Sequence, residues 1–153
     1  MAGALSAEFD GARLVAHEAR ATMLAIQDEP WRNAKSIFPA VWCEWASIAV
    51  SEVLIHRGMG EWTFVSAGLP DSPSSHAWLE LRDENEACQF SIDITLDQFA
   101  EWNEPFVGEG PTPARTRFTE TLYAGPWREW PEIARNDTYA RYAAKVVAYF
   151  DGA

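Results

Sequence analysis

The sequence predicts one α+β domain over residues 1–153, and three observations carry this expectation. Apolar residues recur at helical spacing in the N-terminal third, alternate with polar residues in the middle, and return to helical spacing near the C-terminus. A chain of this length with 48% hydrophobic residues can bury a core of its own. The expected order is therefore helices, then an antiparallel sheet, then a helix.

Two helices are expected first. Apolar spacing predicts a helix over 6–28 with Ser6 as its N-cap. A second helix is expected over 42–58, because cations occupy its last turn and Gly58 suits the position just after a helix.

Period-two alternation then predicts strands joined by turn-rich segments, and a helical pattern follows them. The expected strands are 62–67, 76–81, 88–95 and 116–123, the expected loops are 68–75 and 108–113, and the expected terminal helix is 133–150.

The charge balance excludes two classes of partner. A net charge of −11 and a pI near 4.6 disfavour binding to nucleic acid or to an anionic membrane, because both partners need a basic patch. The N-terminus lacks a signal-peptide pattern, so we expect a cytoplasmic protein. In that compartment Cys43 and Cys88 are expected to be free thiols.

Three residues predict a catalytic site: Cys43 at the start of the second helix, His76 in one strand and Asp93 in the next. If the two strands form a hairpin centred on residues 84 and 85, His76 lies directly opposite Asp93. The same register pairs Leu79 with Phe90 on a face that is apolar throughout. A carboxylate behind an imidazole fixes its tautomer and leaves the other ring nitrogen for a nucleophile.

Cys43 is the expected nucleophile of this set. The helix N-terminus and a neighbouring imidazolium both stabilise a thiolate, although the adjacent Glu44 opposes this effect. The backbone N–H of Cys43 can also donate to an oxyanion. By contrast, Cys88 is expected to be a small buried hydrophobe, and Asp97 is expected to be an N-cap.

These residues resemble a family pattern, carried by Phe38-Pro39 before Cys43, His76-Ala77-Trp78-Leu79-Glu80, and Ile92-Asp93-Ile94-Thr95 followed by Asp97-Gln98-Phe99. The pattern is similar to that of papain-like thiol enzymes, especially the transglutaminase-like superfamily, over roughly residues 36–108. The resemblance implies a fold with the Cys-bearing helix packed on an antiparallel sheet. It also implies that Cys43 is the nucleophile, His76 the general base and acid, and Asp93 the residue that orients His76.

The chain departs from the papain-like pattern at the oxyanion site. Papain-like proteases have a Gln a few residues before the Cys, and 36–42 contain none. The second oxyanion donor is therefore open between the Trp42 indole, Gln27, Asn33 and Gln98. Trp42, Trp78 and Gln98 are the expected substrate-binding residues, and the 68–75 loop is expected at the rim of the cleft.

The expected function is cysteine-dependent acyl transfer on a peptide, protein or small amide through a thioester. Peptidase, amidase, deamidase and transglutaminase-like reactions all fit this chemistry. Two alternatives stay open: a catalytically inactive domain of this fold with an acidic protein-binding surface, and a toxin or effector domain that uses the same triad. No cofactor or metal is expected, because zinc-ligand spacings and phosphate-binding glycine loops are missing from the sequence.

Overall fold

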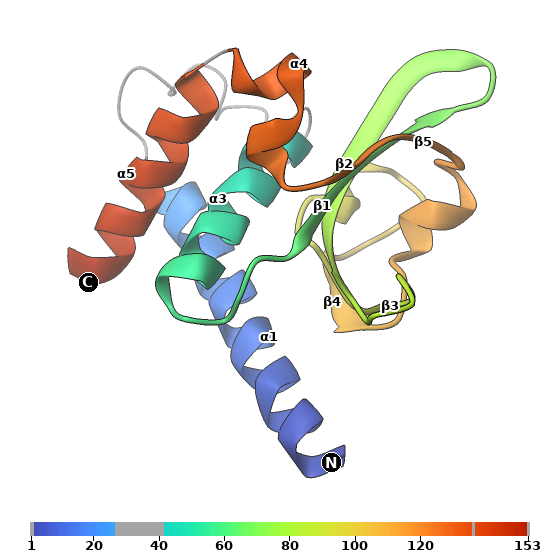
Figure 1. Ribbon diagram of the computed structural model, residues 1–153. Helices are drawn as coiled ribbons and strands as arrows, with labels where there is room; N and C mark the ends of the chain where they lie inside the picture. The colour runs from blue at the N-terminus through green and yellow to red at the C-terminus, as the bar shows by residue number, and fades with distance from the viewer. Residues whose placement is uncertain (1, 27–41, 136, 153) are drawn as a thin grey trace.

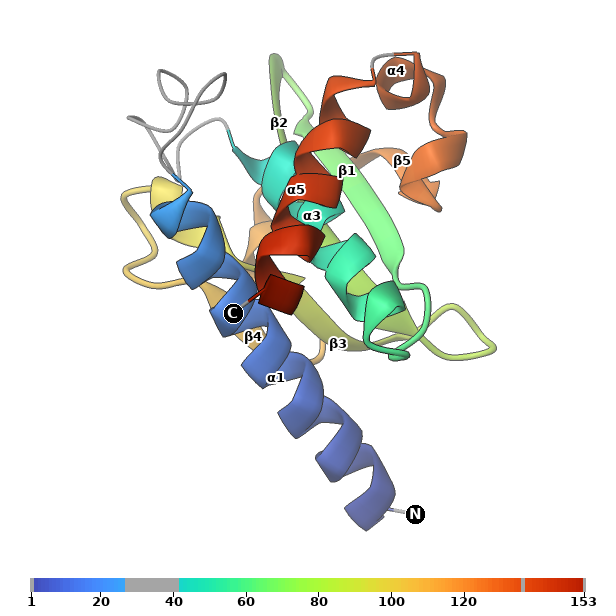
Figure 2. The same ribbon diagram turned by 90° about the vertical axis from the view of Figure 1, so that its left-hand side faces the viewer.

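A five-stranded antiparallel sheet lies between a layer of helices and a layer of short helical turns (Figures 1 and 2). This computed structural model describes residues 2–26, 42–135 and 137–152. Its helices are α1 (Ala2–Ala25), α3 (Cys43–His56), α4 (Pro131–Ala134) and α5 (Thr138–Gly152), and its short 3-10 turns are η1 (Leu96–Gln98), η2 (Pro113–Thr116) and η3 (Trp127–Glu129). The strands are β1 (Thr63–Leu69), β2 (Ser72–Arg82), β3 (Cys88–Asp93), β4 (Phe106–Glu109) and β5 (Glu120–Gly125). The α+β class is thus confirmed.

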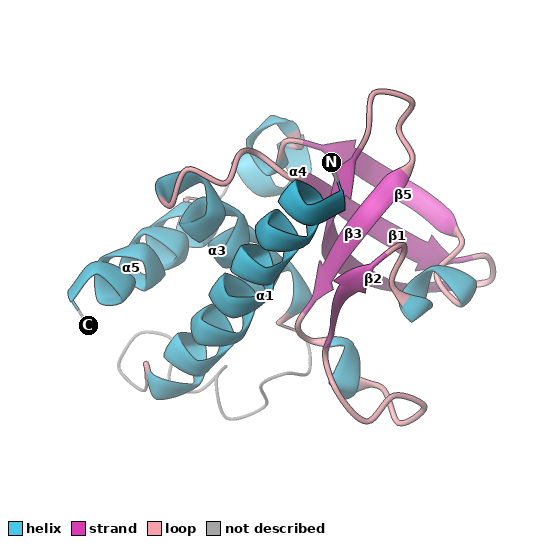
Figure 3. Ribbon diagram, turned by 90° about the horizontal axis from the view of Figure 1, so that it is seen from below, coloured by secondary structure: helices cyan, strands magenta, loops and turns pink. Residues whose placement is uncertain are grey.

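The strand order is β4-β3-β2-β1-β5, so β2 is the central strand. Alternation along β1 and β2 sends Phe64 and Leu79 toward the helices and sends Val65 and Trp78 toward the other layer. Helices and strands stand as separate layers in Figure 3, where α1 lies beside the sheet and α5 lies on the side of α3 that faces away from the strands. The sheet therefore contributes to two hydrophobic clusters, one on each face.

Helix α3 is the most buried helix segment of this core, and it is packed against both α5 and the sheet. It ends as its sequence predicts, because Gly58 adopts a φ of 74° and donates its N–H to the Ile55 carbonyl at 3.0 Å. At its other end Trp42 is the N-cap residue, and the Trp42 carbonyl accepts from Ala46 N–H at 2.8 Å. Cys43 is therefore the first residue of the helix.

Helix α1 begins before the expected cap. It runs from Ala2 through Ser6, so Ser6 is a helical residue and the prediction that it is the N-cap is wrong. Alanine is the strongest helix former, and the alanine-rich segment before Ser6 extends the helix backward. The end of the predicted helix, 27–28, lies outside the described residues.

The prediction of a loop over 68–75 is also wrong. Strands β1 and β2 continue to Leu69 and from Ser72, so only Pro70 and Asp71 form the turn. Proline fixes a φ that suits the first central position of a β-turn, and a turn this tight lets the flanking Gly and Ser residues pair as strands. The segment therefore extends the sheet as a hairpin.

Three later elements differ in extent from the prediction. Part of the predicted 108–113 loop belongs to β4, and β5 begins only at Glu120 because η2 occupies the preceding segment. The predicted helix 133–150 is two helices, α4 and α5, separated near Arg135. Within the described residues, we find no helix that combines the length and the apolar character needed to span a bilayer.

Candidate functional site

The structure brings Cys43, His76 and Asp93 together. His76 Nε2 lies 2.7 Å from Asp93 Oδ1, and neither side chain has exposed surface. The Cys43 thiol lies close enough to His76 to contribute to the raised pKa of the imidazole, and Cys43 is 8% exposed. The imidazole therefore contacts the carboxylate and lies near the sulfur.

The register that holds His76 near Asp93 differs from the predicted one by two residues. Leu79 pairs with Ile92 rather than with Phe90, so His76 is not directly opposite Asp93. The two side chains instead meet on a diagonal, which long side chains on one face can span. A shift of two residues keeps each side chain on its predicted face, and this explains why the contact survives.

The loop between β2 and β3 causes this shift. It contains five residues, Glu86 takes a φ of 66°, and a bulge lies between Leu81 and Arg82. The Asp83 carboxylate accepts from the backbone N–H groups of Asn85 and Ala87 at 2.8 and 2.9 Å. The carboxylate thus closes a loop that lacks the glycine of a two-residue turn.

The N-terminus of α3 is fixed beside β2, where Cys43 reaches His76. The Ser47 hydroxyl donates to the Ala77 carbonyl at 3.4 Å, one turn after Cys43. The Trp42 ring packs edge-on against Tyr142 of α5 at 5.1 Å between ring centroids, and Trp45 packs on the same tyrosine at 5.6 Å. Helix α5 therefore holds the end of α3 that carries the thiol.

Thr112 completes the site behind Asp93. Its hydroxyl donates to Asp93 Oδ2 at 2.7 Å, and Thr112 is buried. Both oxygens of the carboxylate are then engaged, one by His76 and one by Thr112. No sequence pattern points to this role, because Thr112 is in a segment whose residues predict only a loop.

Three aromatic rings surround the His76 imidazole: Phe99 at 5.0 Å, Phe118 at 5.6 Å and Trp78 at 5.8 Å between ring centroids. Burial lowers the pKa of His76, but the Asp93 carboxylate and the Cys43 group outweigh it and raise that pKa from 6.5 to about 9. The imidazolium is therefore the main form of His76 at neutral pH.

Of the expected substrate-binding residues, Gln98 is beside the imidazole. Its Nε2 lies 3.4 Å from His76 Nδ1 and donates to the Thr95 carbonyl at 3.0 Å. Trp42 and Trp78 are only 1% and 0% exposed, so neither presents a surface to a substrate in this structure. Gln27, Asn33 and the segment 36–41 lie outside the described residues.

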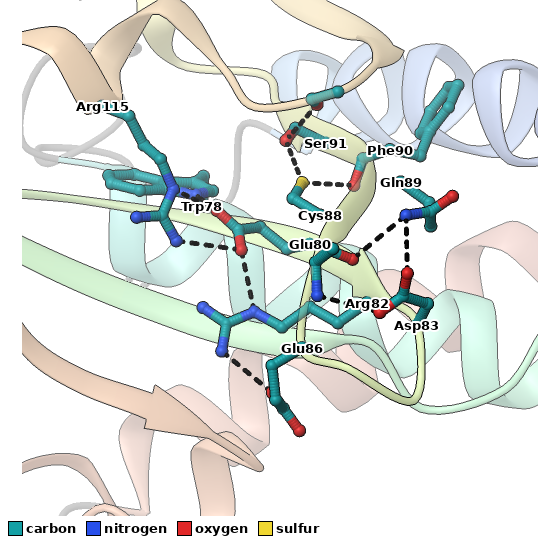
Figure 4. A network of polar contacts seen from close by, with 12 residues as sticks. Trp78, Glu80, Arg82, Asp83, Glu86, Cys88, Gln89, Phe90, Ser91 and Arg115 are labelled. Atoms are coloured by element: carbon teal, nitrogen blue, oxygen red, sulfur yellow. Dashed lines mark hydrogen bonds and ion pairs between the residues drawn. The ribbon is translucent and has the colours of Figure 1, made fainter.

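Trp78 has a structural partner instead. Its indole N–H donates to the buried Glu80 carboxylate at 2.8 Å (Figure 4). Arg115 reaches the same carboxylate at 2.8 and 3.1 Å and Arg82 at 2.9 Å. Burial raises the pKa of Glu80, but the hydrogen bonds from Arg115, Trp78 and Arg82 outweigh it and the pKa is lowered. This network joins β2 to η2.

The second cysteine, Cys88, has other neighbours than Cys43. Its sulfur lies 3.2 Å from the Ser91 hydroxyl and 3.4 Å from the Phe90 carbonyl (Figure 4). Burial is the largest influence on this thiol and raises its pKa. Cys88 is therefore a poor nucleophile at neutral pH, and it provides an internal reference for Cys43.

Asp97 is not the N-cap of η1. Thr95 takes that position, and Asp97 lies inside the turn, where its carboxylate pairs with Arg20 of α1. In the described ranges 2–26, 42–135 and 137–152, no three His, Cys, Asp or Glu side chains are grouped as metal ligands.

Comparison of the chain with models of known protein families, with curated proteins and with solved structures finds no match in any of the three. The function must therefore be inferred from the geometry of Cys43, His76 and Asp93.

Proposed function

We propose that this protein is a cysteine-dependent acyl-transfer enzyme that acts on an amide, with a papain-like or transglutaminase-like arrangement of its site. The observation that supports this most is a buried imidazole that contacts the Asp93 carboxylate and lies close enough to the Cys43 thiol for that group to help raise its pKa. The order of elements agrees with it, because a helix begins at Cys43 and is followed by antiparallel strands that carry His76 and Asp93.

The proposed reaction begins at the Cys43 sulfur. With Nε2 engaged by Asp93, we assign Nδ1 as the nitrogen that holds the proton shared with the thiol, so the reactive form pairs the Cys43 thiolate with the His76 imidazolium. The thiolate attacks the amide carbon, a C–S bond forms, and the carbonyl electrons move to oxygen. When the tetrahedral intermediate collapses, the C–N bond breaks and His76 gives its proton to the departing amine.

The thioester is then resolved by water or by an amine. His76 removes a proton from that acceptor as it attacks, and the Cys43 thiolate leaves. Hydrolysis and transfer differ only in the acceptor, so the same three residues serve an amidase, a peptidase or a transglutaminase-like enzyme. Because the pKa of His76 is raised to about 9, the imidazole still holds at neutral pH the proton that the leaving group needs.

The proposal is tested by alkylation of Cys43 and Cys88 with iodoacetamide, followed by peptide mass spectrometry across the pH range from about 5 to 9. A free thiol has a pKa of about 8.5, whereas a thiolate paired with imidazolium reacts well below that pH. At about pH 6 we expect Cys43 to react about tenfold faster than Cys88, or more. His76→Ala should abolish this advantage, and Asp93→Asn should reduce it.

His56→Ala is the matched control, because His56 lies at the opposite end of α3 and is exposed. This variant should alkylate like the wild type. The proposal fails if Cys43 reacts no faster than Cys88 and His76→Ala changes nothing. That result would favour the catalytically inactive interaction domain.

A further inference from the structure

Arg20 reaches from α1 into the segment that joins β3 to η1. Its two terminal nitrogens lie 3.0 and 2.8 Å from the two carboxylate oxygens of Asp97, and one of them also donates to the Ile94 carbonyl. Both charged side chains are only 18% exposed. A bidentate pair of this kind fixes orientation as well as distance, because the planar guanidinium matches the carboxylate.

The anchored segment lies directly between two site residues. Ile94 follows Asp93 in the chain, and Asp97 precedes Gln98. The η1 turn has three residues, and its N-cap residue Thr95 makes no side-chain capping bond. A single 3-10 turn has little stability of its own, so contacts from outside must hold it in place.

The position of Gln98 matters for the second oxyanion donor. Its amide nitrogen is 3.4 Å from His76 Nδ1, the ring nitrogen that Asp93 does not engage. When Nδ1 carries a proton it cannot accept from the amide, and the amide can donate to an oxygen formed beside the ring. The chain has no Gln shortly before Cys43, so the donor has to come from elsewhere.

We propose that Arg20 is a positioning residue: through Asp97 it holds Gln98 beside His76, and the Gln98 amide donates to the oxyanion formed when Cys43 attacks a carbonyl. This inference rests on the proposed acyl-transfer function. It makes α1 part of the catalytic arrangement, although no residue of α1 belongs to the triad.

Two reagents separate this role from activation of the thiol. Iodoacetamide is attacked at a saturated carbon, so a C–S bond forms, iodide leaves, and no oxyanion arises. p-Nitrophenyl acetate is attacked at its carbonyl carbon, so an oxyanion forms before p-nitrophenolate leaves and an acetyl thioester remains. A donor to the oxyanion therefore affects the second reaction and not the first.

Gln98→Ala should slow acetylation of Cys43 by p-nitrophenyl acetate by about 100-fold, and Arg20→Gln should slow it by about tenfold or more. Alkylation by iodoacetamide should stay within about twofold of wild type in both variants. The double variant should be no slower than Gln98→Ala alone, because Arg20 acts through Gln98. Arg20→Lys, which keeps the charge but not the bidentate contact, should retain part of the rate.

Arg13→Gln is the matched control on the same helix. Arg13 donates to the Val107 carbonyl at 3.4 Å and lies over the Phe90 ring, away from η1. It should change neither reaction. If Arg20→Gln and Arg20→Lys both leave acetylation unchanged, or slow both reactions equally, the inference is wrong while the proposed function stands. If alkylation of wild-type Cys43 does not depend on His76, the proposed function falls and this inference with it.

Discussion

The His76 imidazole is held charged in a place where burial alone would keep it neutral. Its side chain has no exposed surface, and aromatic rings pack around it. The Asp93 carboxylate reverses the effect of burial, and Thr112 in turn holds that carboxylate from behind. The charge on His76 is therefore a property of the folded protein, and it must appear in the pH dependence of stability.

Stability should fall as the pH rises from about 6.5 to about 9. The pKa of His76 is raised from 6.5 to about 9 on folding, so the folded protein binds a proton that the unfolded chain has lost in this range. The stabilisation is fully present below the unfolded pKa and is lost as the pH passes the folded pKa. Its size is about 3 kcal/mol, which urea unfolding at a series of pH values would measure.

His76→Gln supplies the comparison for this prediction. It removes the titrating ring, so its free energy of unfolding should change much less over the same range. Cys43→Ala should reduce the pH dependence only in part, because Asp93 contributes more to the shift than Cys43. Equal pH profiles for wild type and His76→Gln would show that the imidazole is not charged in the folded state.

Strand β2 and the turn η2 are joined by one buried carboxylate. Glu80 accepts from Trp78, Arg82 and Arg115, and the two arginines come from different elements. Because η2 follows directly after Thr112, this network also fixes the segment that supports Asp93. The ion pairs of Glu80 therefore stabilise the attachment of η2 to β2 near the candidate site.

Glu80→Gln should lower the free energy of unfolding by about 2 kcal/mol at neutral pH, because it leaves buried donors with a weaker acceptor. The folded pKa of Glu80 is lowered from 4.5, so its contribution is present above about pH 4.5 and is lost as the pH falls through the folded value. The difference between wild type and Glu80→Gln in urea unfolding should therefore shrink in acid.

Glu86→Gln is the matched control for Glu80→Gln. Glu86 also pairs with Arg82, at 3.2 Å, but its side chain is 76% exposed. An exposed pair contributes little, so this variant should lose no more than about 0.5 kcal/mol. Equal losses for the two variants would contradict the argument from burial.

At the same scale, the sequence predicted the elements better than their connections. The helix that begins at Cys43 and the alternating faces of β2 and β3 follow from local periodicity, and the structure confirms them. The register between β2 and β3 does not follow from local periodicity, because the Asp83 side chain and the bulge before Arg82 determine it. Thr112 and Arg20 could not be identified from the sequence, because their partners, Asp93 and Asp97, are far away in the chain and come near only in the folded protein.

The whole molecule places the candidate site where its two hydrophobic layers meet. Cys43 belongs to the cluster between the helices and the sheet. His76 lies on the opposite face of β2, among the aromatic rings of the second cluster. Because β1 and β2 contribute to both clusters, neither layer can loosen without disturbing the sheet that positions His76.

The two layers should therefore unfold together. Val53 lies in the helix-side cluster and Val65 in the other, and both are fully buried. Val53→Ala and Val65→Ala remove the same two carbon atoms, so each should cost about 2 kcal/mol. In urea, far-ultraviolet circular dichroism and tryptophan fluorescence should report a single shared transition for both variants. If Val65→Ala moved the fluorescence transition and left the circular dichroism transition in place, the second layer would unfold independently, and the site could be lost while the helices stayed folded.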